Sequence, residues 1–315
     1  MKQLQFDFPI GMHLELSGKC NLKCKHCYVN SGAPGTVDIS DIDLLDFFES
    51  YFNYSFIPQI NITGGEAFIR QDLLKDILLL FSKNSPHTHI RLMTNGYFLK
   101  EDFFLFLKEI KNKVSFQISL DGANKASHER VRIVDGSWEK ALDACLLIKK
   151  FNHNLQIATT ITKSNFYEIE DMFKLSVILN ADSIGIGPAY PLGRGIEDKF
   201  NLILSDNEIA EAKEQLYVYK KVYDKYLEVN LTTQLDEHFY NNLSIIKQDW
   251  FIIDNMGNVK IDTRLPYIVG NITKHPIDTL WKKVRHSFEN NKVNEDIEKA
   301  IEQNTLINNM EKIKL

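Results

Sequence analysis

Three of the four cysteines lie within one short segment, at Cys20, Cys24 and Cys27. Thiolates this close together can bind one soft metal centre, which is how proteins hold zinc and iron–sulfur clusters. Both kinds of centre usually take four protein ligands, and three ligands with one open position are typical of a reactive metal site. From these residues alone, a structural zinc site completed by His26 or a distant residue, or a set of unrelated thiols, is an equal alternative.

A glycine pair followed by a carboxylate, Gly64-Gly65-Glu66, comes directly after the β-rich segment 59–63. Glycines at a strand end let the backbone approach a ligand, because no Cβ stands in the way. A plain strand-to-helix turn would contain the same pair. The cysteine segment follows the β-rich segment 12–16, and loops at the carboxyl ends of parallel strands open on the same edge of a sheet. We therefore expect both motifs to face one site.

The elements that must position these motifs alternate between strand and helix from residue 12 to about residue 190. Ser40 and Asn165 are expected to open helices as capping residues. Six alternations indicate a parallel sheet with helical crossovers, and an open doubly wound sheet or a closed or partial barrel would satisfy them. The predicted strands are 12–16, 59–63, 89–94, 115–120, 156–162 and 183–188, and three further helices are predicted at 70–84, 100–113 and 137–152.

The pattern changes after Gly195. A long helix is predicted from Ser205 to about Leu227, followed by a strand at 229–233 and a β-hairpin at 250–261. The tail beyond Trp281 is polar, charged and predicted to be helical. Neither an internal repeat nor a low-complexity linker separates the two parts, so we expect the second part to pack on the first.

Composition narrows the range of partners and compartments. The 315 residues carry a net charge of −5 with dispersed lysines and arginines, so nothing favours a nucleic-acid partner. The sequence contains no apolar run as long as a membrane span and begins with no signal peptide. Clustered cysteines do not form a disulfide framework, and a reducing cytoplasm is the simplest compartment.

These motifs resemble the radical S-adenosylmethionine (SAM) superfamily, in particular its peptide-modifying branch. The cysteine spacing with the trailing aromatic Tyr28, and the Gly-Gly-Glu run after the second predicted strand, carry the resemblance. It covers residues 10 to about 195, and the zinc alternative becomes minor beside it. Further matching segments are Thr94-Asn95-Gly96, 118–122, His128-Glu129 with Arg132, Gly136-Ser137-Trp138, 158–162 with Asn165, Gly187-Pro188 and 192–195.

The resemblance implies an α/β fold, a partial (β/α)6 TIM barrel, and a specific cofactor chemistry. Cys20, Cys24 and Cys27 would ligate three irons of one [4Fe–4S] cluster, and SAM would chelate the fourth iron through its amino and carboxylate groups. One electron from the reduced cluster would cleave SAM to methionine and a 5′-deoxyadenosyl radical, which abstracts a hydrogen from the substrate. The resemblance identifies no catalytic residue of the protein itself.

The resemblance also assigns the contacts to SAM. The backbone at Gly64 and Gly65 and the carboxylate of Glu66 match the acceptors that the methionine ammonium needs. Ser119 and Arg132 match donors to the methionine carboxylate or the ribose. Tyr28 and Asn95 are expected near the adenosyl group. Cys145, on a predicted crossover helix, is expected to pack in the hydrophobic core. His26 is expected to point away from the cluster.

The second part departs from the family pattern. Relatives in this branch carry a C-terminal SPASM module whose cysteines bind auxiliary iron–sulfur clusters. Segments 256–262 and 270–281 keep the outline of that module, but no cysteine follows Cys145. We predict a radical SAM core at 1–200, and at 201–315 a helix, a C-terminal α+β module resembling a degenerate SPASM domain, and a helical tail. An auxiliary cluster is not expected.

The first functional hypothesis is a single-cluster radical SAM enzyme acting on a ribosomally made peptide, with a flavodoxin or ferredoxin type protein as one-electron reductant. Only about eleven residues precede the first predicted strand, so a separate leader-binding protein is expected to deliver the substrate, or the second part to bind it. Epimerisation with a cysteine as hydrogen donor is disfavoured. The alternatives are an enzyme of cofactor, tetrapyrrole or small-metabolite biosynthesis, and a non-catalytic cluster-bearing scaffold protein. Substrate identity, the bond formed, the fate of SAM and the oligomeric state stay open.

Overall fold

One continuous sheet organises the computed structural model of the chain. Its strands follow the order β11-β10-β9-β8-β1-β2-β3-β4-β5-β6-β7. The residues described are 7–189, 193–195, 201–231, 250–263, 265–287, 290, 292, 293, 295, 313 and 314.

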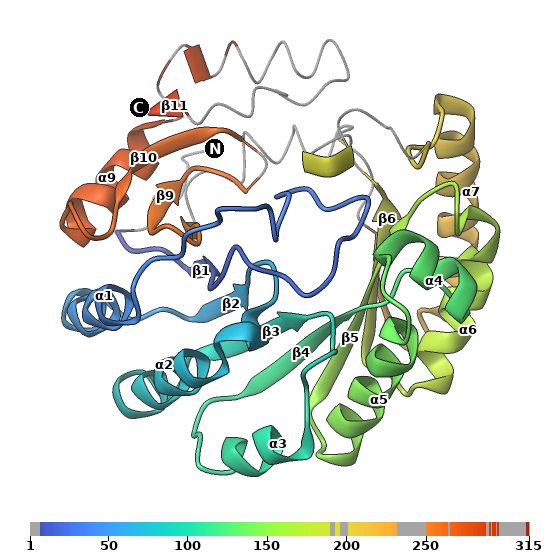
Figure 1. Cartoon of the computed structure of the whole chain (residues 1–315), viewed down its shortest axis with the longest axis horizontal. Coiled ribbons are helices and arrows are strands. Elements are labelled where there is room, and N and C mark those ends of the chain that lie inside the picture. The colour runs from blue at the N-terminus through green and yellow to red at the C-terminus, as the bar shows by residue number, and fades with distance from the viewer. Residues whose placement is uncertain are drawn as a thin grey trace.

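The first seven strands are all parallel to their neighbours. They form a curved sheet, with helices on its outer, convex side (Figure 1). The sheet ends at β7 and β11 without closing, so the expectation of an α/β partial barrel is confirmed. The strands are β1 (Gly11–Glu15), β2 (Gln59–Thr63), β3 (His89–Thr94), β4 (Val114–Ser119), β5 (Asn154–Ile161), β6 (Ser183–Pro188) and β7 (Glu228–Leu231).

Helices connect these strands, and the larger ones cover the outer face of the sheet (Figure 1). The helical segments are α1 (Asp41–Tyr54), η1 (Ala67–Arg70), α2 (Gln71–Asn84), α3 (Glu101–Leu107), α4 (Lys125–Arg132), α5 (Ser137–Lys150), η2 (Phe166–Glu168), α6 (Ile169–Ile178), η3 (Gly193–Gly195) and α7 (Asp206–Tyr223). Ser40 caps α1 by accepting a hydrogen bond from the Asp43 backbone N–H, and Ser205 with Glu208 forms a capping box on α7.

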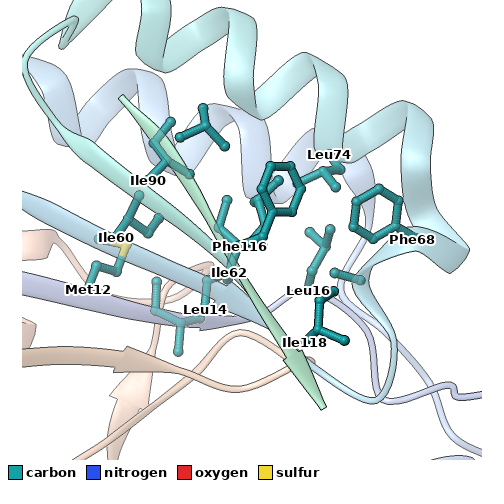
Figure 2. Close-up of a cluster of buried hydrophobic side chains, with 14 of the residues drawn as sticks. Met12, Leu14, Leu16, Ile60, Ile62, Phe68, Leu74, Ile90, Phe116 and Ile118 are labelled. Carbon is teal, nitrogen blue, oxygen red and sulfur yellow. The ribbon is translucent and has the colours of Figure 1, made fainter. Parts of the chain in front are cut away.

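Apolar and polar side chains alternate along these strands, so the apolar ones face the helices and the polar ones face the inner, concave side of the sheet. On β2, Ile60 and Ile62 are fully buried, whereas Asn61 and Thr63, which alternate with them, are half-buried. Figure 2 shows the apolar side chains of β1 to β4 packed together beneath Phe68 and Leu74 of the covering helices. The hydrophobic core therefore lies between sheet and helices, which leaves the polar inner face for a site.

Two expected helices differ from the structure. Helix α3 ends at Leu107 rather than Lys113, because the following segment turns toward α2: the Lys111 N–H donates to Ser82 Oγ, and Asn112 donates to the Ser85 and Thr88 carbonyls. Asn165 makes no side-chain cap on η2. Its Oδ1 accepts from the Thr162 N–H instead. Helix α4 was not predicted.

The C-terminal part continues the same sheet beyond β1. It contains β8 (Trp250–Ile253), β9 (Asn258–Lys260), β10 (Tyr267–Asn271), α9 (Ile277–Ser287) and β11 (Ile313–Lys314). Strand β8 pairs in parallel with β1, and β8 and β9 form the expected antiparallel hairpin. The ring of Trp281 on α9 lies 6.4 Å from that of Phe251 on β8, and Phe251 stacks on Phe47 of α1 at 6.1 Å.

The predicted boundary at residue 200 stays a prediction, and β7, from the predicted second part, pairs with β6. Most of the predicted helical tail lies outside the described residues, as do Thr232, Thr233 and Leu192. In the part of the chain that the structure describes, no helix combines the length and the apolar character needed to cross a membrane.

Candidate functional site

The loops that follow β1 and β2 cross in direct backbone contact. The Gly65 N–H donates to the Ser17 carbonyl at 2.6 Å, and the Glu66 N–H donates to the Lys19 carbonyl at 2.9 Å. A Cβ on Gly65 would lie 2.2 Å from the Lys19 oxygen, and one on Gly64, whose φ is +137°, would lie 2.4 Å from the Ser17 oxygen. Both positions therefore require glycine, because the crossing presses the start of the cysteine loop against the end of β2.

A cavity of about 240 Å³ opens beside this crossing at the carboxyl ends of the strands. Its wall also includes Gln117 and Thr160, which project from the inner faces of β4 and β5. All the predicted site residues except Glu66 line it: Cys20, Cys24, Cys27, Tyr28, Gly64, Gly65, Asn95, Ser119 and Arg132. The structure thus brings together residues from the first four strand-to-helix loops and α4.

Each clustered thiol accepts a hydrogen bond from its own donor. The Leu22 N–H lies 3.4 Å from Cys20 Sγ, the Ser31 N–H lies 3.4 Å from Cys27 Sγ, and the Arg132 Nη1 lies 3.6 Å from Cys24 Sγ. Burial raises the pKa of Cys20 to about 11 and also raises the pKa of Cys24. Both are therefore protonated at neutral pH until a metal displaces the protons.

The three thiols fit a cluster better than a single ion. Among the residues that the structure describes, no group of three or more His, Cys, Asp or Glu side chains could hold one metal ion. The cysteines nevertheless share one cavity, and all are free thiols. A [4Fe–4S] cluster takes each thiolate on a different iron, so its ligands need not meet at one point. The donor set is compatible with such a cluster.

A buried charge network lies behind Cys24. Arg132 Nε donates to Asp121 Oδ2 at 2.7 Å, and His26 Nε2 lies 3.3 Å from the same oxygen. Burial alone would raise the pKa of Asp121, but Arg132 and then His26 hold it below its usual value. Burial lowers the pKa of His26 to about 4. His26 lines the cavity and its Nε2 faces Asp121, which lies outside the cavity wall, and the expectation that His26 points away from the cluster stays a prediction.

Glu66 is fully enclosed and does not line the cavity. Its Oε1 accepts from Thr94 Oγ1 at 2.7 Å and from the Phe68 N–H at 3.1 Å, and its Oε2 accepts from the Asn95 N–H at 2.9 Å. Burial raises its pKa. The carboxylate thus ties the end of β3 to the loop after β2, and its contact with a methionine ammonium stays a prediction.

Arg194 is a site residue to which the sequence analysis gave no role. Its Nε donates to the Cys24 carbonyl at 2.8 Å, and its Nη1 donates to the Ser31 carbonyl at 2.7 Å. Directly before it, a Cβ on Gly193 would lie 2.2 Å from the Cys27 oxygen. The loop after β6 therefore clamps the backbone of the cysteine loop. The Gly-Arg-Gly run was the available signal, but only the fold brings it to the cysteines.

Comparison with known proteins gives a consistent family match. A model described as the radical SAM superfamily matches residues 14–176. The subtilosin biosynthesis protein AlbA of Bacillus subtilis, subtilosin being an antilisterial bacteriocin, is 29% identical over 196 residues, which are 60% of this chain and 42% of AlbA. The AdoMet-dependent heme synthase of Nitratidesulfovibrio vulgaris is 25% identical over 302 residues, which are 86% of this chain and 78% of that protein.

Solved structures agree with the fold. The structure of anSMEcpe with bound AdoMet and Cp18Cys peptide superposes with a TM-score of 0.67 at 19% identity, covering 89% of this chain and 82% of that one. At this identity the likeness concerns the fold alone. The chain spans less than half the length of the first two curated relatives that it matches.

Proposed function

Because the chain belongs to the radical SAM superfamily, whose members use a [4Fe–4S] cluster and SAM, we propose that it is an enzyme that reductively cleaves SAM at one cluster and acts on a peptide. The observation that carries this proposal is the shared cavity: three thiols, a glycine loop and an arginine line it together. When bound, the reduced cluster and SAM supply a radical that removes a hydrogen atom from the substrate.

The residues of the chain divide the task of holding these groups. In this proposal Cys20, Cys24 and Cys27 ligate three irons, and the crossing at Gly64 and Gly65 keeps backbone groups at the cavity wall. Three thiolates leave one iron open to SAM. The cysteine loop is held from β2 and from Arg194, which supports a site whose shape is set before ligands bind.

Polar groups on the cavity wall suit the two ends of SAM. Arg132 offers a charged donor to the methionine carboxylate, and Ser119 a hydroxyl. Tyr28 and Asn95 line the same cavity as the cysteines, which supports a role for them in binding the adenosyl group. Glu66 contributes to ammonium binding through the end of β3 that it holds, or directly if its internal bonds rearrange.

The peptide substrate is supported by the family relatives. AlbA is a biosynthesis protein of a bacteriocin, and the mycofactocin maturase MftC of Mycolicibacterium smegmatis is 28% identical over 212 residues. We propose a ribosomally made peptide that a separate leader-binding protein delivers, a flavodoxin or ferredoxin type reductant, and the cytoplasm as compartment, where the free thiols would stay reduced.

A second candidate function is modification of a tetrapyrrole. Its support is the heme synthase alignment, which spans most of both chains, whereas the AlbA alignment spans 60% of this chain. Both candidates share the cluster and SAM, and they differ in what occupies the inner face of the barrel.

Substrate-dependent SAM cleavage separates the two candidates. The reconstituted protein is incubated anaerobically with dithionite and SAM, together with either a precursor peptide encoded beside its gene or a tetrapyrrole, supplied with and without bound iron. We expect the peptide to raise the yield of 5′-deoxyadenosine and to change in mass. Stimulation by the tetrapyrrole alone would overturn the peptide proposal and leave the SAM chemistry standing. A Cys24→Ala variant controls for cleavage outside the site.

A further inference from the structure

Asp121 is fully buried at the end of β4, directly behind the cavity. One oxygen, Oδ2, accepts from Arg132 Nε at 2.7 Å, and the other, Oδ1, accepts from the Thr160 N–H at 2.9 Å. Its own backbone is also held: its N–H donates to His128 Nδ1, and its carbonyl accepts from Asn165 Nδ2. The carboxylate therefore has one fixed position and one fixed charged partner.

Arg132 connects this carboxylate to the cysteines. Its Nε points to Asp121, and its Nη1 lies 3.6 Å from Cys24 Sγ. The planar guanidinium presents these donors in fixed directions, so the bond to Asp121 determines where Nη1 points. The other two clustered thiols accept from the uncharged N–H groups of Leu22 and Ser31. Of these three donors, Arg132 alone brings a charge to a thiol.

We propose that Asp121 is a positioning residue that holds Arg132 against Cys24 and thereby sets the reduction potential of the cluster. The proposal rests on the cluster assignment above and goes beyond it, because it assigns a task to a carboxylate outside the cavity wall. A charged donor to a ligand sulfur stabilises the more negative, reduced cluster, so the potential rises when Arg132 is in place. A buried carboxylate acting only through its own negative charge would lower the potential instead.

These opposite signs define the test. Asp121→Asn keeps the size of the side chain but leaves one acceptor oxygen for two donors, Arg132 Nε and the Thr160 N–H, so it weakens the hold on Arg132. In the native background it removes both the positioning of Arg132 and the negative charge. In an Arg132→Met background no guanidinium remains to be positioned, so the substitution removes only the effect of the carboxyl group itself, whose pKa Arg132 no longer holds down.

The reduction potential of the reconstituted cluster, without SAM, is measured by redox titration followed by electron paramagnetic resonance. We expect the shift caused by Asp121→Asn to be more negative in the native background than in the Arg132→Met background, because only the native background also loses the positioning of Arg132. Equal shifts in the two backgrounds would overturn the proposal, because Asp121 would then act as a charge alone. Asp121→Glu, which keeps a carboxylate, should lie closer to the native potential than Asp121→Asn.

Two controls keep the outcome unambiguous. Asp182 also pairs with a lysine and a backbone N–H, at the opposite end of the strands, so Asp182→Asn should leave the potential unchanged. If Arg132→Met does not load a cluster, Arg132→Lys replaces it, since one ammonium cannot bridge Asp121 and Cys24 in the guanidinium geometry. Failure of the native protein to load a cluster would refute the proposed function. A loaded cluster without coupling would refute only the role of Asp121.

Discussion

The chemistry of single residues at this site depends on what each thiol touches. Burial keeps Cys20 and Cys24 protonated in the free protein, so metal binding must release protons and strengthen as pH rises. Arg194 donates hydrogen bonds to the backbone carbonyls of Cys24 and Ser31 and none to the cysteine sulfurs. The cysteines that ligate the cluster and the residue that shapes their loop can therefore be tested by separate mutations.

Replacing one clustered cysteine should remove the cluster, and replacing the fourth should not. In Cys27→Ala we expect the iron content after reconstitution to fall from about four per chain toward zero, because two thiolates hold the cluster poorly. Cys145 is fully buried in α5, away from the cavity, so Cys145→Ala is the matched control and should keep its iron. Iron and sulfide analysis measures both. Equal losses in the two variants would contradict the assignment.

A half-buried histidine on β1, His13, should make folding sensitive to acid. Burial lowers the pKa of His13 from 6.5 to about 4. The unfolded chain therefore binds a proton first as pH falls, and stability present above pH 6.5 is lost between pH 6.5 and about 4. We expect urea unfolding to show about 2 kcal/mol of this loss between pH 7 and pH 5. His13→Gln should show a correspondingly smaller decrease, whereas replacement of the exposed His87 by Gln should change nothing. An unchanged decrease in His13→Gln would exclude this residue as the cause.

The elements that matter most are the loops at the carboxyl ends of β1, β2 and β6. Backbone hydrogen bonds join the cysteine loop to the end of β2, and Arg194 joins it to the loop after β6.

Strand positions were predictable, because residues such as Ile60 and Ile62 alternate with polar neighbours along each strand, and all six predicted strands agree with the structure within two residues. The end of α3 could not be predicted, because it depends on hydrogen bonds from Asn112 to the Ser85 and Thr88 carbonyls, which lie far away in the sequence.

For the site, the sequence predicted which residues line the cavity but not the contacts that hold them. Local motifs identified the residues that line the cavity, because their spacing lies within single loops. The enclosed position of Glu66 and the contacts of Asp121 and Arg194 depend on which loops the fold brings together. No local pattern carries that information.

The loop crossing gives an element-scale prediction. In Gly65→Ala the new methyl group would meet the Lys19 carbonyl at 2.2 Å, a backbone atom that cannot move aside. We expect a loss of about 1–3 kcal/mol in the free energy of unfolding and a lower iron content after reconstitution. Thermal unfolding and iron analysis measure the two effects. In Gly185→Ala the methyl group meets only the end of the Gln156 side chain, so this control should be nearly neutral. A stable, fully loaded Gly65→Ala protein would show that the crossing does not shape the site.

At the scale of the whole molecule, the C-terminal strands belong to the same sheet as the barrel. Strand β8 pairs with β1, the strand that leads into the cysteine loop. Phe251 lies between Phe47 of α1 and Trp281 of α9. The part without cysteines therefore supports the first strand of the barrel, whatever further role it has toward substrate.

Truncation of Trp281 tests this support. The side chain is 1% exposed, and Trp281→Ala should lower the free energy of unfolding by about 3–5 kcal/mol. Because the sheet is continuous, the barrel should be destabilised with it, in a single transition measured by circular dichroism. Tyr167→Ala, at an aromatic residue that is 85% exposed, should have little effect. Two separate transitions, with the first alone shifted, would show that the C-terminal part folds independently of the barrel.

The proposed function requires that the cysteine loop hold an open-site cluster that cleaves SAM. Its most direct measurement is the yield of 5′-deoxyadenosine from the reconstituted protein with dithionite and SAM under anaerobic conditions, compared with Cys20→Ala. We expect 5′-deoxyadenosine and methionine in equal amounts from the native protein and none from the variant. A native protein that carries about four irons per chain and yet forms no 5′-deoxyadenosine would contradict it.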